Sequence, residues 1–104
     1  MAEKVVCFEG DSFEKLANFP TKVREKFVQD LEMLKVGMQP LSAVSSMNGL
    51  GHGVCELKKN GKPAYRLVYV IKGNLIHVLH VFSKTSNGTD KKHEQTIKLR
   101  YKNV

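Results

Sequence analysis

Cations and an imidazole interrupt two segments of the chain that otherwise consist mainly of apolar residues. Arg66 stands within residues 64–71, and His80 and Lys84 stand within residues 75–84. Burying a cation costs free energy unless an opposite charge pairs with it, and an anionic ligand such as a phosphate would supply that charge. A histidine beside such cations can also exchange a proton at neutral pH, because imidazole titrates near pH ~6.5. The residue types therefore predict a site that binds a phosphate and moves protons.

These side chains can form one site only if neighbouring strands present them on the same face. Three segments are rich in the β-branched and aromatic residues that strands favour, and the turn signals Asn60-Gly61 and Gly73-Asn74 separate them. We therefore predict an antiparallel meander with strands at residues 54–58, 64–71 and 75–84. Strict alternation along the last strand would put five side chains on one face: Ile76, Val78, His80, Phe82 and Lys84.

The turn between the last two strands decides whether Arg66 meets His80. A three-residue loop at 72–74 places the two residues opposite each other, whereas a two-residue loop at 72–73 places them on opposite faces. We favour the three-residue loop because it gathers the polar side chains on one face and leaves the other face for helices. His77 would then point toward those helices as a core histidine.

The preceding turn leaves two alternatives open. A two-residue turn puts Leu57 and Lys59 on the face of Arg66. A loop one residue longer puts Glu56 and Lys58 there. Either alternative places a lysine beside the arginine.

Helices are predicted before and after the meander in the sequence. The first two cover residues 13–18 and 21–36, and Asp11 or Ser12 is the candidate N-cap of the first. The second has four apolar residues at helical spacing: Val23, Phe27, Leu31 and Leu34. Residues 39–53 are expected to form a flexible loop, and residues 90–101 a basic helix. With an opening strand at residues 5–8, the order β-α-α-β-β-β-α predicts an α+β domain in which a helical hairpin packs on an antiparallel sheet.

Composition limits the class of protein. The chain has 104 residues, which suits a single domain over residues 1–104, and its net charge is +7. A compact basic domain attracts polyanions or acidic proteins. Cys7 and Cys55 match no zinc or redox spacing and are expected to be free thiols in a reducing compartment. Neither a signal-peptide pattern nor an apolar run of membrane-spanning length is present, so we expect a cytoplasmic protein.

Three strand motifs follow one another in the second half of the chain: VCELK at residues 54–58, AYRLVY at 64–69 and VLHVFSK at 78–84. They are similar, in that order, to the motifs V/I-x-E-L-R/K, A-Y-R-V-x-Y and V-L-H-x-F-x-K of one protein family. Over residues 53–100 the chain thus resembles the phage-derived HigB-like toxins of the RelE/ParE toxin superfamily, which belong to type II toxin–antitoxin systems. The resemblance implies a RelE-like fold.

The same resemblance implies a metal-independent endoribonuclease without a cofactor. Such a toxin cleaves mRNA, usually on the translating ribosome, and a helix-turn-helix antitoxin holds it inactive. Matched by position, the family's functional residues fall on Lys58, Arg66, His80 and Lys84. The chain departs from the family pattern in three places: Thr85 replaces a second lysine, Thr89-Asp90 replaces a Thr-Pro pair, and His93 stands where the family usually has a glutamate. His93 therefore becomes a second imidazole candidate.

Cleavage of this kind begins when a 2′-hydroxyl attacks the adjacent phosphorus, which requires a base, an acid for the leaving 5′-oxygen, and cations for the phosphate. We assign the phosphate to Arg66 and Lys84, and the acid–base role to His80 with His93 in reserve. RNA contacts are expected from four lysines: Lys58, Lys59, Lys91 and Lys92. No metal site is expected, because His77 and His80 would face opposite ways on a strand. The alternatives are a non-catalytic ParE-like toxin that inhibits gyrase and a phage nucleic-acid-binding protein.

Overall fold

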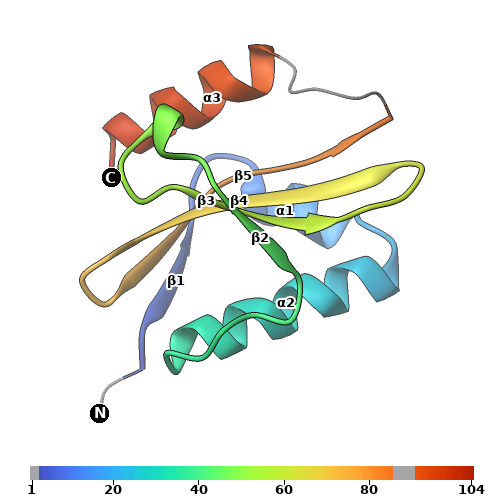
Figure 1. Ribbon diagram of the computed structural model, residues 1–104, viewed down its shortest axis with the longest axis horizontal. Helices are drawn as coiled ribbons and strands as arrows, with labels where there is room; N and C mark the ends of the chain where they lie inside the picture. The colour runs from blue at the N-terminus through green and yellow to red at the C-terminus, as the bar shows by residue number, and fades with distance from the viewer. Residues whose placement is uncertain (1–2, 86–90) are drawn as a thin grey trace.

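The protein has three layers in the computed structural model, which describes residues 3–85 and 91–104 (Figure 1). A five-stranded sheet lies in the middle, with helices α1 and α2 on one face and α3 on the other. In chain order the elements are β1 (Val5–Phe8), α1 (Ser12–Ala17), α2 (Thr21–Lys35), β2 (Ala43–Ser46), the 3-10 helix η1 (Asn48–Leu50), β3 (Cys55–Lys59), β4 (Ala64–Lys72), β5 (Leu75–Lys84) and α3 (Lys91–Lys102). This architecture confirms the α+β class and the helical hairpin packed on a sheet.

The sheet is mixed, whereas the sequence predicted a purely antiparallel one. Its strand order is β1-β5-β4-β3-β2. The strands β2 to β5 are antiparallel neighbours, which confirms the predicted meander, but β1 pairs in parallel with β5. This pairing brings the start of the chain beside the strand that carries His80.

The prediction of a flexible loop over residues 39–53 is wrong, because this segment contains β2 and η1. The buried carboxylate of Asp30 on α2 accepts hydrogen bonds from the backbone N–H groups of Leu41 and Ser42, at 2.9 and 3.2 Å, and a third from the Ser42 hydroxyl. These bonds fasten the segment to α2 at the point where it turns into the sheet beside β3. Periodicity could not reveal β2, because the strand has four residues and is mostly exposed.

The predicted three-residue loop between β4 and β5 is also wrong. Lys72 pairs with Leu75, so the turn consists of Gly73 and Asn74. Gly73 has a φ of 61°, the left-handed conformation that a type II′ turn requires at this position. This two-residue turn alone would put Arg66 and the β5 imidazole on opposite faces of the sheet.

A β-bulge reverses that outcome. Val68 pairs with His80 and Tyr69 pairs with Val78, which leaves Leu79 as an extra residue in β5. Beyond the bulge, Arg66 pairs with Phe82. Arg66, His80 and Lys84 therefore share the face that α3 covers, as the sequence predicted, but by a different route. The expected alternation of all five β5 side chains is wrong, since Ile76 and Val78 pack with α1 and α2 instead.

The hairpin between β3 and β4 gives the facing expected from the longer of the two alternatives, but its loop is longer than either, since residues 60–64 separate the paired Lys59 and Tyr65. Lys58 pairs with Arg66, and Lys59 pairs with Tyr65. The ring of Tyr65 lies 4.8 Å from that of Phe19, between α1 and α2. Glu56 and Lys58 thus lie on the α3 face, and Lys59 lies on the opposite face.

Two apolar clusters hold the layers together. The cluster between the sheet and the helical hairpin includes the four predicted residues of α2, and the cluster under α3 is formed by Val54, Val68, Val70, Leu79, Phe82 and Ile97. The helix bounds agree with the prediction to within one residue at each end that the structure describes, and the predicted start at Asp90 lies outside the described residues, as does Thr89. Within residues 3–85 and 91–104, no helix is both long and apolar enough to cross a membrane.

Candidate active site beneath α3

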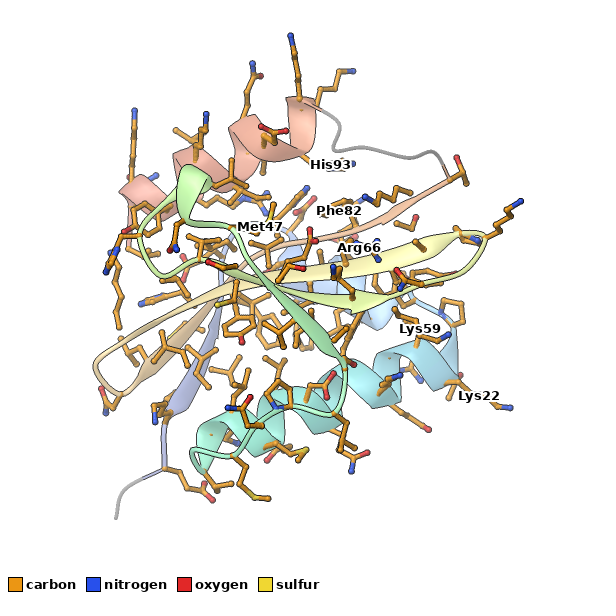
Figure 2. The ribbon with its side chains drawn as sticks, viewed as in Figure 1. Lys22, Met47, Lys59, Arg66, Phe82 and His93 are labelled. Atoms are coloured by element: carbon orange, nitrogen blue, oxygen red, sulfur yellow. The ribbon has the colours of Figure 1, made fainter. Side chains whose placement is uncertain are left out.

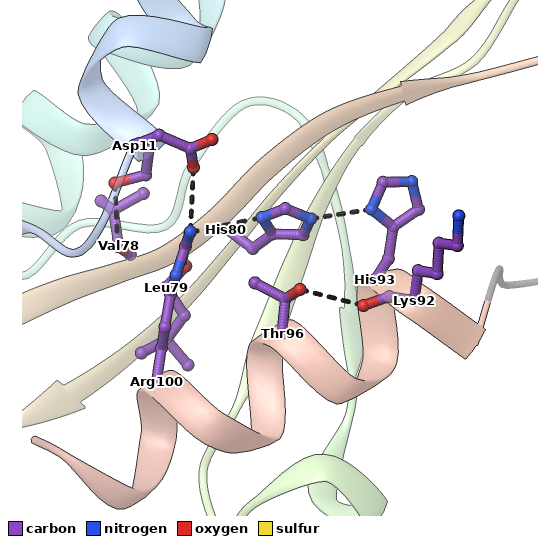
Figure 3. Close-up of polar contacts among 9 residues, drawn as sticks. Asp11, Val78, Leu79, His80, Lys92, His93, Thr96 and Arg100 are labelled. Carbon is purple, nitrogen blue, oxygen red and sulfur yellow. Dashed lines mark hydrogen bonds and ion pairs between the residues drawn. The ribbon is translucent and has the colours of Figure 1, made fainter.

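Two imidazoles meet between the sheet and α3 (Figure 3), and Figure 2 shows one of them, His93, with Phe82. Nε2 of His80 lies 2.8 Å from Nδ1 of His93, so a hydrogen bond joins the bulged part of β5 to the first turn of α3. The ring of Phe82 stacks on both imidazoles, with its centroid 4.0 Å from that of His93 and 5.1 Å from that of His80. The two histidines that the sequence offered as alternatives are therefore partners in one cluster.

His80 is the inner member of the pair. Only 8% of its surface is exposed, whereas His93 is partly exposed. Burial, followed by the charges of His93 and Arg100, lowers the pKa of His80 to about 4. His80 is therefore uncharged at neutral pH and holds no proton that it could readily give to a leaving group.

Nδ1 of His80 faces the guanidinium of Arg100 (Figure 3). Nη1 of Arg100 lies 3.4 Å from Nδ1 of His80 and donates a 2.9 Å hydrogen bond to the carbonyl of Leu79. Nη2 of the same group forms an ion pair with Asp11, 3.0 Å from Oδ1. This hydrogen bond lowers the pKa of the Asp11 carboxyl. Asp11 occupies the predicted N-cap position of α1, but its carboxylate makes no side-chain capping bond to the helix.

Arg66 is held by groups of the protein itself. It is 7% exposed, and its Nε lies 3.5 Å from Oε1 of Glu56, a distance that allows an ion pair although Nε makes no hydrogen bond. Nη1 donates to the carbonyl of Tyr65 at 3.0 Å, and Nη2 donates to Oδ1 of Asn60 at 3.2 Å. Glu56 thus supplies the negative charge for which the sequence suggested a bound phosphate. An incoming phosphate would compete with this carboxylate.

The predicted lysines divide between the two faces. Lys58 lies directly opposite Arg66, and Lys84 lies at the end of β5 opposite Ala64, so both are on the α3 face. Lys59 is on the other face, and Figure 2 shows it toward the α2 side of the sheet. Lys91 and Lys92 are exposed in the first turn of α3, the turn that carries His93.

Sequence reasoning missed Arg100 and Asp11 as members of the site. Arg100 follows His93 by two helical turns and shares its face with the buried Ile97, and this spacing is a signal that it points at the sheet. Asp11 carries no comparable signal, because the ion pair joins residues 89 positions apart.

Among the described residues, no group of three His, Cys, Asp or Glu side chains is placed to hold a metal ion. The argument about His77 nevertheless needs correction. His77 pairs with Val70, whose side chain packs under α3, so His77 and His80 lie on the same face. Nδ1 of His77 is 3.0 Å from Oε2 of Glu9, so a partner within the chain accounts for this imidazole without a ligand.

Comparison with known protein families finds a match to the family described as "Phage derived protein Gp49-like (DUF891)" over residues 14–102. The matched range contains every residue of the cluster beneath α3 except Asp11. No curated protein and no solved structure is significantly similar to the chain.

Proposed function

Because this chain belongs to the Gp49-like family of phage-derived proteins, we propose that it is the toxin of a type II toxin–antitoxin system and that it cleaves mRNA. The Gp49-like family is related to RelE-type toxins, which are endoribonucleases. The HigB-like strand motifs on β3, β4 and β5 support the same assignment, because they carry the cations and the inner imidazole of the site.

One observation carries the proposal: the imidazole pair lies on the same face of the sheet as a row of cations that is centred on Arg66. Phe82 links the two parts, since it is the cross-strand partner of Arg66 and stacks on His93. Lys58 and Lys84 extend the row on either side of Arg66. Cations in such a site stabilise the charge that develops on a phosphate during cleavage.

In the proposed reaction a 2′-hydroxyl gives its proton to water, and its oxygen bonds to the adjacent phosphorus. The bond from phosphorus to the 5′-oxygen breaks, and that oxygen takes a proton from water. The products are ends with a 2′,3′-cyclic phosphate and a 5′-hydroxyl. We assign the RNA-facing position to His93, because it is the less buried imidazole, and a supporting position to His80. The acid–base role that the sequence favoured for His80 finds no support in its burial.

The proposed partners are mRNA, the ribosome and a helix-turn-helix antitoxin that keeps the toxin inactive in the cytoplasm. A net charge of +7 favours association with a polyanion. Lys91 and Lys92 would extend the contact with RNA from the site along the start of α3.

Controlled expression in growing bacteria, with transcript ends mapped, tests the proposal. We expect growth arrest and new ends with the two product groups for the wild type, and loss of both for His93→Ala. His52→Ala is the matched control, since its imidazole is exposed in the segment after η1; it should behave as the wild type. Growth arrest with intact transcripts would contradict the proposal, and arrested supercoiling beside intact mRNA would indicate the gyrase-directed alternative.

A further inference from the structure

The contact between Arg100 and His80 restricts where the imidazole protons can lie. A guanidinium carries N–H donors only and stays charged in proteins. Nδ1 of His80, 3.4 Å from Nη1 of Arg100, must therefore act as the acceptor. Since His80 is neutral, its single ring proton is on Nε2.

The proton on His80 then determines the tautomer of His93. Nε2–H of His80 donates across the 2.8 Å contact, so Nδ1 of His93 accepts. A neutral His93 consequently carries its proton on Nε2, the nitrogen that points away from His80 in Figure 3.

The same network resists a positive charge on the pair. A proton added to Nδ1 of His93 would face Nε2–H of His80, and moving the His80 proton to Nδ1 would face Arg100. Among the other charged groups that the structure describes around His80, Lys15 opposes protonation and Asp11 favours it. Arg100 therefore opposes a positive charge on His80.

Two segments of the chain converge on the Arg100 guanidinium and fix its position. Asp11 binds it from the turn before α1, and the carbonyl of Leu79 binds it from the β5 bulge. Gly10 lets the backbone pass close by, because a Cβ at this position would lie 2.4 Å from Cζ of Arg100. Such convergence is typical of a side chain whose orientation matters to a site.

We propose that Arg100, held by Asp11, is a positioning residue that fixes the tautomers of His80 and His93, so that His93 meets RNA as a hydrogen-bond donor through Nε2–H. The reference to RNA rests on the proposed function. A neutral imidazole that donates in this way stabilises negative charge developing on a phosphate oxygen without supplying a proton. The transfer of protons during cleavage then falls to groups other than the imidazoles.

Nitrogen NMR of the histidine rings tests the assignment on the free protein at neutral pH. In the wild type, His80 and His93 should both show a protonated Nε2 and an unprotonated Nδ1. Arg100→Met removes the donor, so His80 should gain a population with the proton on Nδ1, and its pKa should rise from about 4 toward 6.5. Lys98→Met removes an exposed charge from the same helix and should leave both tautomers unchanged.

Asp11→Asn provides a second variant if Arg100→Met fails to fold. It weakens the hold on the guanidinium and should shift the His80 tautomer in the same direction by a smaller amount. A wild-type spectrum with Nδ1–H on either ring, or tautomers unchanged in both variants, would overturn the proposal. Correct tautomers in a protein that cleaves no RNA would leave Arg100 as the positioning residue and refute only the nuclease.

Discussion

Nε2 of His80 lies 2.8 Å from Nδ1 of His93 because β5 contains one extra residue. Without the bulge at Leu79, the register set by the Gly73-Asn74 turn would direct His80 toward the helical hairpin. The bulge aims the imidazole at α3 and presents the Leu79 carbonyl to Arg100. A single irregularity in the ladder thus determines both the contact and its orientation, a known use of bulges beside active sites.

Substitutions in the ion pair between Arg66 and Glu56 should distinguish the effect of Arg66 on the stability of the fold from its effect on RNA cleavage. Both side chains are about nine-tenths buried, so Arg66→Leu leaves an uncompensated carboxylate and should destabilise the fold by about 3–5 kcal/mol. The double variant Arg66→Leu, Glu56→Leu should recover most of this loss but remain inactive toward RNA. Urea unfolding measures the first effect and cleavage of a model RNA the second. Recovery of cleavage in the double variant would show that Arg66 has only a structural role.

The depressed pKa of His80 should make the fold sensitive to mild acid. The folded-state value is about 4, below the ~6.5 of an unfolded histidine. Between these values the unfolded chain binds more protons, so this contribution to stability is present above pH ~6.5 and is lost as the pH falls. From pH 7.5 to pH 5 it should decrease by about 2 kcal/mol.

His80→Asn removes this titration. Its free energy of unfolding should therefore fall less than that of the wild type over the same pH range, although it starts from a lower value. His52→Ala is the control, because it removes an exposed imidazole outside the His80 cluster. Parallel curves for the wild type and His80→Asn would mean that His80 titrates normally in the folded protein.

The donor role of His93 predicts an ordering of its variants. His93→Leu removes the N–H group and should slow cleavage by ~10²–10³. His93→Gln retains an N–H donor and should lose less. Single-turnover cleavage rates distinguish the two variants, and equal losses would argue that His93 acts through protonation instead.

Two adjacent lysines allow the RNA-binding face to be tested directly. Lys58 lies opposite Arg66 on the α3 face, and Lys59 is on the other face. Each phosphate contact with a single strand contributes about 0.7 to the slope of log affinity against log salt concentration. Lys58→Gln should therefore flatten the slope by about 0.7, while Lys59→Gln should leave it unchanged. The reverse result would place RNA on the side of the helical hairpin.

Apart from β2 and η1, the elements of this protein could be predicted from its sequence, because each of them has a local signal. The apolar spacing of α2, the turn signals of the meander and the motifs on β3, β4 and β5 each lie within a short stretch of chain. Arg66, Lys84 and both imidazoles could be named as candidates from these stretches, since a cation in an apolar strand can be recognised without a structure.

Only the tertiary structure decided how those residues meet. The sheet face on which His80 lies depends on a bulge. A register shift of one residue moves every side chain of a strand to the other face, although the local preference of the sequence for a strand does not change. The burial of Arg66 with Glu56 depends on the register of a second hairpin, and the strand β2 depends on bonds to Asp30 from a different element. Arg100 and Asp11 are joined across 89 positions by charges whose partner no local pattern specifies. Long-range hydrogen bonds and ion pairs therefore determine the site, because they form only after packing has chosen which surfaces come together.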